Sequence, residues 1–222
     1  MMTASPTALH PAPNFNRLAD VYRWTEWITF GPLLALCRNT YLHRMRSCRR
    51  ALIIGDGDGR FTAKLLRSNP DISADVLDAS PAMLSALTQR AAGNSPRLRT
   101  HCLDAREWQP DGAKYDLIVT HFFLDCLTTD EVRALANRIR SAAAPDAIWV
   151  VSEFAIPHNL FGHLIASPLV RALYWAFGSL TGLSVHQLPD YSAAMRSADF
   201  MPVSRKSRLS GLLACELWIC NR

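Results

Sequence analysis

The glycine-rich run at residues 51–61, ALIIGDGDGRF, constrains the fold of this chain more than any other segment. Its first four residues are apolar, which predicts a short buried strand, and three glycines at alternate positions follow directly: Gly55, Gly57 and Gly59. Glycine permits a positive φ and lets a ligand approach closer than a Cβ would allow. Residues 60–68 then have helical spacing. The run therefore predicts a ligand-binding loop at the first strand–helix turn of an α/β sheet.

Strand and helix patterns alternate along most of the chain. The expected strands are 51–54, 74–77, 97–102, 115–120 and 147–153, and the expected helices are 60–68, 81–92 and 129–142. This alternation predicts a Rossmann-like α/β fold, in which a doubly wound, mostly parallel sheet carries helices on both faces. A helix at 190–198 and strands at 200–208 and 211–220 complete the chain, and the last two strands are joined by a tight turn.

Composition and the positions of glycine and proline predict one domain with two helical additions. The chain has 222 residues, 49% of them hydrophobic and 19% charged, which suits a single globular domain over residues 14–222. Residues 1–13 are polar and proline-bearing, and we expect a disordered leader there. Residues 14–48 predict an N-terminal helical cover, and the apolar, glycine-interrupted stretch 158–189 predicts a helical lid insert before the last two strands.

Charge and cysteine usage narrow the class of protein. The net charge is +5, but the basic residues are not interleaved with aromatic ones, so we expect no nucleic-acid partner. The six cysteines form no C-x-x-C pair, which predicts small buried side chains in a reducing cytoplasm. We expect no metal site, because no histidine spacing fits one. No apolar run reaches the roughly 18–20 residues that span a bilayer, so we expect a cytoplasmic protein.

The aspartate that ends the second expected strand is the next informative residue. Asp78 follows the strand at 74–77 and lies roughly twenty residues beyond the glycine loop, where a carboxylate can accept hydrogen bonds from both hydroxyls of a ribose. A plain strand-end aspartate followed by a helix cap would explain Ser80 and Pro81, but it would not explain the distance to the glycine loop. We therefore interpret Asp78 as a ribose ligand.

The glycine spacing separates two classes of nucleotide-binding protein. The dinucleotide fingerprint G-x-G-x-x-G requires glycine at position 60, where this chain has Arg60. The pattern G-x-G-x-G with Asp78 downstream instead resembles the loop of class I S-adenosylmethionine-dependent methyltransferases. The run DASPAML at residues 78–84 resembles the motif that follows the second strand in that class. The resemblance implies a seven-stranded sheet ending in an antiparallel hairpin, with S-adenosyl-L-methionine as cofactor.

The resemblance also implies a set of cofactor contacts. The glycine loop would hold the methionine end, Asp78 the ribose, and Asp104, which follows a third strand, the amine of adenine. Thr120 and His121, at the end of a fourth strand, would lie near the reacting methyl group. The full set of expected cofactor-binding residues is Tyr22, Gly55, Asp56, Gly57, Gly59, Asp78, Ala79, Met83, Asp104, Ala105, Thr120 and His121.

The acidic residues inside the loop admit two interpretations. Asp56 and Asp58 carry negative charge that would complement the sulfonium or amino group of the cofactor. They would equally cap the helix that follows, since carboxylates are favourable at a helix N-terminus. The family usually has an acidic residue two positions before the first loop glycine, whereas this chain has Ile53. Asp56 or Asp58 would then substitute for that acid.

A catalytic pair is one hypothesis for the end of the fourth strand. A histidine has an ordinary pKa near neutrality, so His121 would serve as a general base, with Asp125 to orient it. The alternative is that His121 lines the adenosine pocket and that Asp125 caps the next helix. Methyl transfer does not require a strong base when the nucleophile and the methyl group are held in line.

A narrower resemblance concerns the N-terminal segment and the acceptor. The run NFNRLADVYRW at residues 14–24 looks like the corresponding segment of ubiquinone/menaquinone C-methyltransferases, although Arg23 stands where that family has an acidic residue. It implies that Tyr22 lies near the cofactor, and it suggests a small acceptor that is lipophilic or aromatic. The alternative is that Tyr22 is a core aromatic of an amphipathic helix.

The lid insert is the expected substrate side. Its aromatic and aliphatic residues would wall an apolar pocket, rest on a membrane surface as a peripheral contact, or pack as an ordinary core. The expected substrate-pocket residues are His158, Phe161, Tyr174, His186 and Tyr191.

Two other functions share the same cofactor loop. One is a non-methylating enzyme of this fold that uses S-adenosylmethionine. The other is a catalytically silent protein that binds S-adenosylmethionine or docks to a membrane. An NAD-linked oxidoreductase is disfavoured by Arg60. No feature of the sequence sets an oligomeric state.

Overall fold

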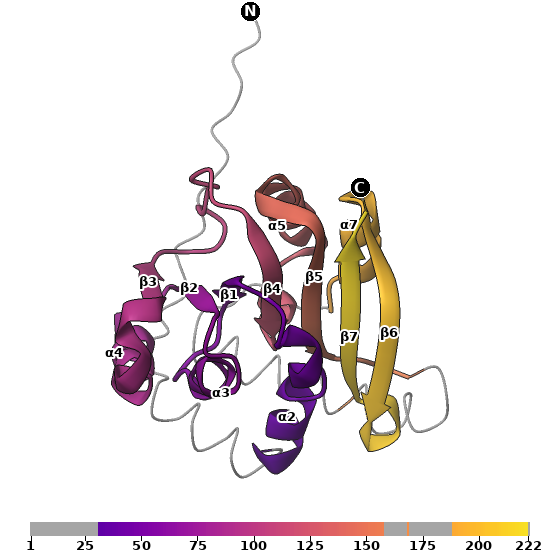
Figure 1. Cartoon of the computed structure of the whole chain (residues 1–222). Coiled ribbons are helices and arrows are strands. Elements are labelled where there is room, and N and C mark those ends of the chain that lie inside the picture. Colours follow the sequence, from indigo (N-terminus) through magenta and orange to yellow (C-terminus); the bar gives the residue numbers. More distant parts are fainter. Residues whose placement is uncertain (1–30, 158–167, 169–187, 222) are drawn as a thin grey trace, which may run out of the picture.

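One seven-stranded sheet organises the protein, which we describe from a computed structural model (Figure 1). The structure describes residues 31–157, 168 and 188–221. The strand order is β3-β2-β1-β4-β5-β7-β6, and all neighbouring strands are parallel except where β7 pairs with β5 and β6. The strands are β1 (Arg50–Ile54), β2 (Ser73–Asp78), β3 (Leu98–Cys102), β4 (Tyr115–His121), β5 (Ala143–Phe154), β6 (Phe200–Arg208) and β7 (Leu213–Cys220).

Helices cover both faces of this sheet. Figure 1 shows α2, α3 and α4 in a row along one side, and the core on that side contains residues of all three. The second core contains residues of α5 and α7. The α-helices are α2 (Gly31–Arg38), α3 (Arg60–Ser68), α4 (Pro81–Arg90), α5 (Thr129–Ala142) and α7 (Tyr191–Ser197). Short 3₁₀ helices are η2 (Leu42–Met45), η3 (Ala92–Arg97), η4 (Leu124–Cys126) and η6 (Leu209–Gly211).

Strand β1 lies at the centre of the sheet and is buried on both faces. Leu52 and Ile54 belong to the core with α5, whereas Ile53 belongs to the core with α3. Side chains of a strand alternate between faces, so a central parallel strand needs apolar residues at every position. The run at 51–54, where no residue is more than 1% exposed, meets this requirement. It therefore places the glycine loop at the carboxyl end of an inner parallel strand, next to β4.

Local sequence signals explain where the helices begin. Ser80 precedes α4 and its hydroxyl accepts a hydrogen bond from the Met83 N–H, with Pro81 in the first turn. Thr128 and Glu131 form a reciprocal capping box at the start of α5. These caps satisfy amide groups that would otherwise lack partners.

The sequence predicted the type of every described α-helix and strand from β1 to β7 and the antiparallel C-terminal hairpin. From β1 to β7 most boundaries agree within one residue, and the end of α4 and the starts of β5 and β7 differ by more. β5 begins at Ala143 because that residue pairs with Tyr115 before the register shifts, and β7 begins at Leu213 because η6 forms the turn. The predicted leader, most of the helical cover and nearly all of the lid insert lie outside the described residues. The predicted break at Gly31-Pro32 coincides with the start of α2.

The cysteines correct one prediction from the sequence. We expected six unpaired thiols, but Cys37 of α2 and Cys215 of β7 form a disulfide across a sequence separation of 178 residues, with Cα atoms 6.0 Å apart. No local spacing could signal this pair, because only the packing of α2 on β7 brings the two cysteines together. The remaining described cysteines, Cys48, Cys102, Cys126 and Cys220, are free.

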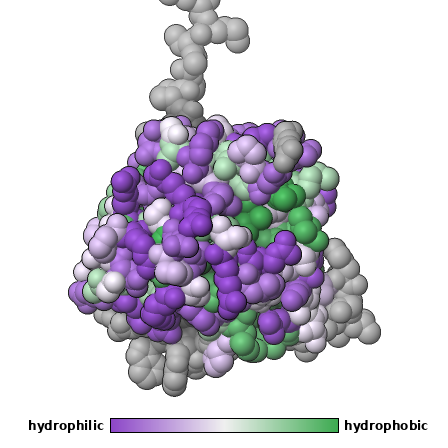
Figure 2. Space-filling model, viewed as in Figure 1, coloured by the Kyte–Doolittle hydropathy of each residue, from purple (hydrophilic) through white to green (hydrophobic). Residues whose placement is uncertain are grey.

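The face shown in Figure 2 is predominantly hydrophilic. Figure 2 shows one face on which hydrophobic side chains gather to the right of the centre, in the part of the molecule that holds β6 and β7 in Figure 1. On β6, which forms one edge of the sheet, Met201 is 48% exposed and Val203 is 53% exposed. Within the described residues, no helix combines the length and the apolar character needed to cross a bilayer.

The disulfide gives a stability prediction. A cross-link over 178 residues restricts the unfolded chain, and its loss typically costs about 2–4 kcal/mol. We expect reductant to lower the urea midpoint of the wild-type protein and to leave that of Cys37→Ala/Cys215→Ala unchanged. Cys102→Ser, which removes an exposed thiol, is the matched control and should respond to reductant as the wild type does. A wild-type midpoint that ignores reductant would contradict the cross-link.

Candidate functional site

A cavity lies at the carboxyl ends of β1, β2, β3 and β4, the edge where open α/β sheets bind ligands. Seven of the residues predicted to contact a cofactor line it together, contributed by three different strand exits and by α4. The lining residues are Ile54, Gly55, Gly57, Leu77, Asp78, Ala79, Met83, Leu103, Asp104, Ala105, Arg106, Phe122, Phe123, Cys126 and Leu127.

The three loop glycines have positive φ but different neighbours. The Cβ of any residue at position 55 would lie 2.4 Å from Cδ2 of Phe123, and one at position 59 would lie 2.4 Å from Cγ of Leu87. Gly55 and Gly59 therefore allow close packing of neighbouring elements. Gly57, with φ +59°, has only the Met83 sulfur within 4 Å of the corresponding Cβ position, at 3.9 Å. Gly57 is the glycine that leaves space beside the cavity.

Asp78 connects the glycine loop to the end of β2. Its Oδ1 accepts a hydrogen bond of 2.9 Å from the Ser80 N–H, and its carboxylate also accepts one from the Gly57 N–H. Burial raises the pKa of Asp78, and these two hydrogen bonds act in the opposite direction. The carboxylate thus lines the cavity and fixes the neighbouring loop at the same time.

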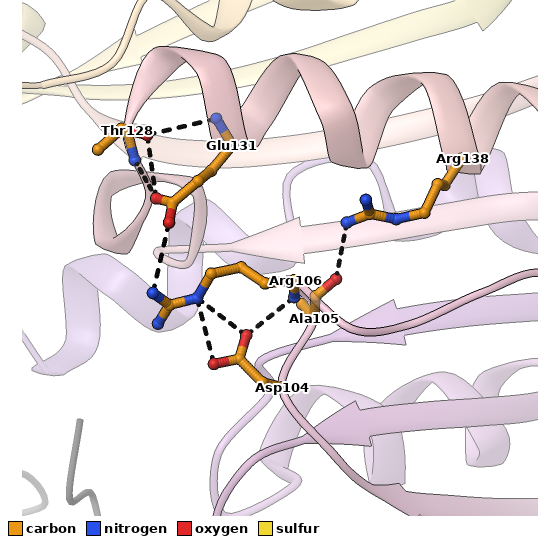
Figure 3. A network of polar contacts seen from close by, with 6 residues as sticks. All are labelled: Asp104, Ala105, Arg106, Thr128, Glu131 and Arg138. Carbon is orange, nitrogen blue, oxygen red and sulfur yellow. Dashed lines mark hydrogen bonds and ion pairs between the residues drawn. The ribbon is translucent and has the colours of Figure 1, made fainter. Parts of the chain in front are cut away.

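Asp104 belongs to a polar network rather than standing alone in the cavity wall (Figure 3). The Arg106 side chain donates from Nε to both Asp104 oxygens at 3.1 Å, and its Nη1 lies 3.3 Å from Oε1 of Glu131 on α5. The Glu131 carboxylate also accepts from the Thr128 N–H at 2.8 Å. Arg138, further along α5, donates to the Ala105 carbonyl at 3.0 Å. The exit of β3 is therefore held against α5 by charged groups.

Asp56 has the capping role, whereas Asp58 pairs with arginines. Asp56 is 9% exposed and accepts from the Thr62 N–H at 2.8 Å and from the Thr62 hydroxyl at 2.6 Å, which caps the first turn of α3. Burial raises the pKa of Asp56 to about 6. Asp58 forms ion pairs with Arg60 at 2.9 Å and Arg90 at 3.0 Å. Neither aspartate lines the cavity.

The predicted His121–Asp125 pair is not formed. His121 is 3% exposed, its ring packs edge-on against Phe61 of α3 at 4.6 Å, and within the described structure neither ring nitrogen has a hydrogen-bond partner. Burial, with a contribution from Arg38, lowers the pKa of His121 well below 6.5. Burial raises the pKa of Asp125, which lies beyond the strand exit in η4, to about 6. Thr120, also buried, accepts from Trp149 Nε1 at 2.9 Å.

Tyr191 is the one predicted substrate-pocket residue that the structure describes. It begins α7, packs against the core on the α5 side, and forms a side-chain hydrogen bond with Glu216 of β7. Burial raises the pKa of its phenol. It does not line the cavity. The predicted contact Tyr22 and the predicted pocket residues His158, Phe161, Tyr174 and His186 lie outside the described residues.

Sequence reasoning missed the two phenylalanines at the exit of β4. Phe122 has φ +54°, a left-handed conformation that is rare for an aromatic residue, and Phe123 covers Gly55. Both line the cavity. The position of the Phe-Phe pair directly after a predicted strand was a usable signal, because strand exits form the ligand edge of such sheets. The positive φ itself has no sequence signature here.

Comparisons with known proteins agree with this architecture. Residues 52–149 match the family model described as a methyltransferase domain. The chain is 33% identical over 108 residues to malonyl-[acyl-carrier protein] O-methyltransferase 1 of Ilyobacter polytropus, which covers 49% of this chain and 39% of that protein. The chain thus spans about two fifths of the length of this curated relative.

Solved structures share the fold over most of the chain. N-methyltransferase NodS of Bradyrhizobium japonicum WM9, in complex with S-adenosyl-L-homocysteine, aligns with a TM-score of 0.63 at 17% identity, covering 86% of this chain and 89% of NodS. An O-methyltransferase family protein of Burkholderia thailandensis aligns with a TM-score of 0.68 at 16% identity, covering 94% and 61%. The fold is therefore the Rossmann-like fold of class I methyltransferases.

The part of the chain that matches the methyltransferase-domain model, residues 52–149, contains the glycine loop, Asp78 and Asp104. The resemblance inferred from the glycine loop and from Asp78 is confirmed at this level, and S-adenosylmethionine is the cofactor of such a domain.

The loop glycines give a prediction that separates packing from ligand access. Gly59→Ala would press a methyl group into Leu87 at a positive φ, so we expect a loss of about 1–3 kcal/mol in the free energy of unfolding. Gly57→Ala meets no close atom, so it should cost less stability while it weakens the binding of S-adenosylhomocysteine. Thermal unfolding and calorimetric titration measure the two effects. The opposite assignment of the two losses would refute this division of roles.

Asp56 gives a prediction for the pH dependence of stability. Its folded pKa of about 6 lies above the ordinary value of 3.8, so the native state binds more protons between these pH values, and Asp56 lowers stability as the pH rises through this range. Asp56→Asn keeps an acceptor oxygen for Thr62 and removes the titration. Urea unfolding at pH 4 and pH 6 should therefore show the variant gaining on the wild type at the higher pH. A constant difference would contradict the raised pKa.

Proposed function

We propose that this protein is an S-adenosylmethionine-dependent methyltransferase whose acceptor is a small lipophilic or aromatic molecule. The observation that carries the proposal is the cavity that joins Gly57, Asp78 and Asp104 at three adjacent strand exits. When bound, the cofactor supplies an electrophilic methyl group on a sulfonium. The protein's own residues bind the cofactor, orient it and exclude water around it.

The cavity residues fit such a cofactor. The space beside Gly57 admits a close approach to the backbone, and the Asp78 carboxylate suits a pair of ribose hydroxyls. The apolar side chains of Leu77, Met83 and Leu103 suit the faces of an adenine ring. These residues come from β2, α4 and the exit of β3, so they lie on the β2–β3 side of the glycine loop.

Asp104 would accept a hydrogen bond from the exocyclic amine of adenine while it remains paired with Arg106. A carboxylate has about four lone-pair positions, and Arg106 uses one on each oxygen. The Arg106 backbone N–H also donates to Oδ1 at 2.8 Å, so Oδ2 is the less occupied oxygen. We infer that Oδ2 accepts the amine and that the ion pair fixes the carboxylate for it.

Positioning, rather than a strong base, accounts for catalysis in this proposal. Among the described residues that line the cavity, the ionisable ones are Asp78, Asp104, Arg106 and Cys126. The first three have the binding roles given above, and burial raises the pKa of the Cys126 thiol well above 9.0. The lining near Phe122, Phe123 and Leu127 is apolar, which supports an apolar acceptor approaching from that end.

The atom that receives the methyl group is left open by the relatives. Their names include an O-methyltransferase and an N-methyltransferase, so both acceptor types occur on this fold. The non-methylating and catalytically silent alternatives have no supporting observation in the described residues. Peripheral membrane contact through the lid insert stays a prediction, because nearly all of that segment lies outside the described residues.

Asp78 provides the test of cofactor binding. A hydrogen bond to a charged group is worth about 1.5–3 kcal/mol, so Asp78→Ala should raise the Kd for S-adenosylhomocysteine roughly tenfold or more in calorimetry. Asp71→Ala, which removes an exposed carboxylate paired with Arg49, is the control and should bind as the wild type does. Unchanged affinity in Asp78→Ala would remove the ribose assignment.

Turnover is tested with methyl-labelled S-adenosylmethionine and a pool of small metabolites. We expect label in an organic-extractable product together with S-adenosylhomocysteine. Cofactor consumption without label transfer would favour the non-methylating alternative. A wild-type protein that does not bind S-adenosylhomocysteine at all would overturn the proposed function.

A further inference from the structure

Glu153, the penultimate residue of β5, is a buried carboxyl group that accepts hydrogen bonds from the exit of β4. The residue is almost completely buried, with 1% of its surface exposed. Oε1 accepts from the Phe123 N–H at 3.1 Å and from the Leu124 N–H at 2.8 Å, and the Asp125 N–H also bonds to this carboxyl group. Oε2 has no hydrogen-bond partner within the described structure. One side chain thus gathers three consecutive amides.

These amides follow directly after a strained residue. Phe122 has φ +54°, a conformation that is unfavourable for a bulky residue unless its surroundings hold it. Its N–H donates to the Ser152 carbonyl at 2.7 Å. Ser152 and Glu153 of β5 therefore fix the chain at and immediately after the strained residue. The backbone of β4 cannot leave the sheet in another direction without losing these bonds.

The direction of this turn decides the shape of the cavity wall. Phe122 and Phe123 both line the cavity, and the Phe123 ring lies so close over Gly55 that a Cβ there would be 2.4 Å from it. Phe122 also packs against Phe154 of β5, with ring centroids 5.3 Å apart. The wall on this side of the glycine loop is thus attached to β5 by backbone bonds and by ring packing.

We propose that Glu153 is a positioning residue for cofactor binding, which holds the exit of β4 so that Phe122 and Phe123 close against the glycine loop. Glu153 does not itself line the cavity, so it acts through the two phenylalanines. The inference rests on the proposed function, because the bound molecule is taken to be S-adenosylmethionine or its product.

The surroundings of Glu153 indicate that an acceptor oxygen, rather than a negative charge, holds the exit of β4. Three ionisable groups interact with it electrostatically: Asp125 and Cys126 of η4, and Tyr191 of α7. Burial, and then the nearby Asp125, raise the pKa of Glu153 well above 4.5, which favours its neutral form. A neutral amide of the same shape should therefore replace it.

Two substitutions separate an acceptor from simple filling of space. Glu153→Gln keeps an oxygen that can accept from Phe123 and Leu124, whereas Glu153→Leu keeps similar volume and leaves these amides unpaired. We expect the Kd for S-adenosylhomocysteine to rise roughly tenfold in Glu153→Leu and to stay within about threefold of wild type in Glu153→Gln, because an unsatisfied buried amide is costly. Calorimetry measures the affinity, and thermal unfolding shows how much stability each variant loses.

Glu216→Leu is the matched control. Glu216 is a buried glutamate of the adjacent strand β7, and it accepts from Trp218 Nε1 at 2.9 Å rather than from the exit of β4. This variant should lose stability and keep the wild-type affinity. Wild-type affinity in Glu153→Leu, or an equal loss in Glu153→Gln and Glu153→Leu, would overturn the positioning role. Failure of the wild type to bind would instead refute the proposed function.

Hydrogen exchange on the wild-type protein tests the same inference without any substitution. Saturating S-adenosylhomocysteine should slow exchange at the amides of Phe123 and Leu124, because ligand that packs on their side chains stabilises the turn they belong to. The amides of β6, on the far edge of the sheet, serve as the internal reference. Exchange at Phe123 and Leu124 that is unaffected by bound ligand would overturn the proposal even if Glu153→Leu does not fold.

Discussion

The close contact between Gly55 and the Phe123 ring is the constraint on which the site depends. It joins the exits of β1 and β4, two neighbouring parallel strands at the centre of the sheet. The contact exists only because position 55 has no Cβ and because the chain turns through a positive φ at Phe122. The glycine loop is therefore shaped from both sides, by its own sequence and by an aromatic wall that arrives 68 residues later in the chain (123 minus 55).

The sequence alone was sufficient to predict the elements of the fold that follow from hydrophobic periodicity. Continuous apolar runs such as 51–54 and helices with caps such as Ser80 predicted the alternating elements, and alternation places Gly57, Asp78 and Asp104 at one edge. The cysteine pair and the turn at Phe122 were not predictable in this way. Both depend on contacts between residues that are distant in the chain or adjacent only across strands.

The acidic residues near the loop show how a sequence can leave two physical roles open and a structure can separate them. Asp56 and Asp58 follow strand β1 at positions where a ligand-binding residue could stand. However, the carboxylate of Asp56 bonds to Thr62, and that of Asp58 pairs with Arg60 and Arg90. Asp78 differs because it lines the cavity itself and accepts a hydrogen bond from the Gly57 amide of the cavity lining. The distinction depends on the partner of each carboxylate. The partner of Asp56 is Thr62, six residues further along the chain, and one partner of Asp58 is Arg90 of α4.

Strand alternation also explains why His121 cannot take the role that its position in the sequence suggested. Along β4, Ile118 belongs to the core on the α5 side, whereas Leu117, Val119 and, by alternation, His121 face α3. A histidine on that face meets Phe61 and loses water, so its neutral form is favoured. The cavity begins only beyond the strand, where the turn at Phe122 ends the alternation. The residues that line the cavity therefore lie at the carboxyl ends of the strands or just past them, as Asp78, Gly57 and Phe123 do.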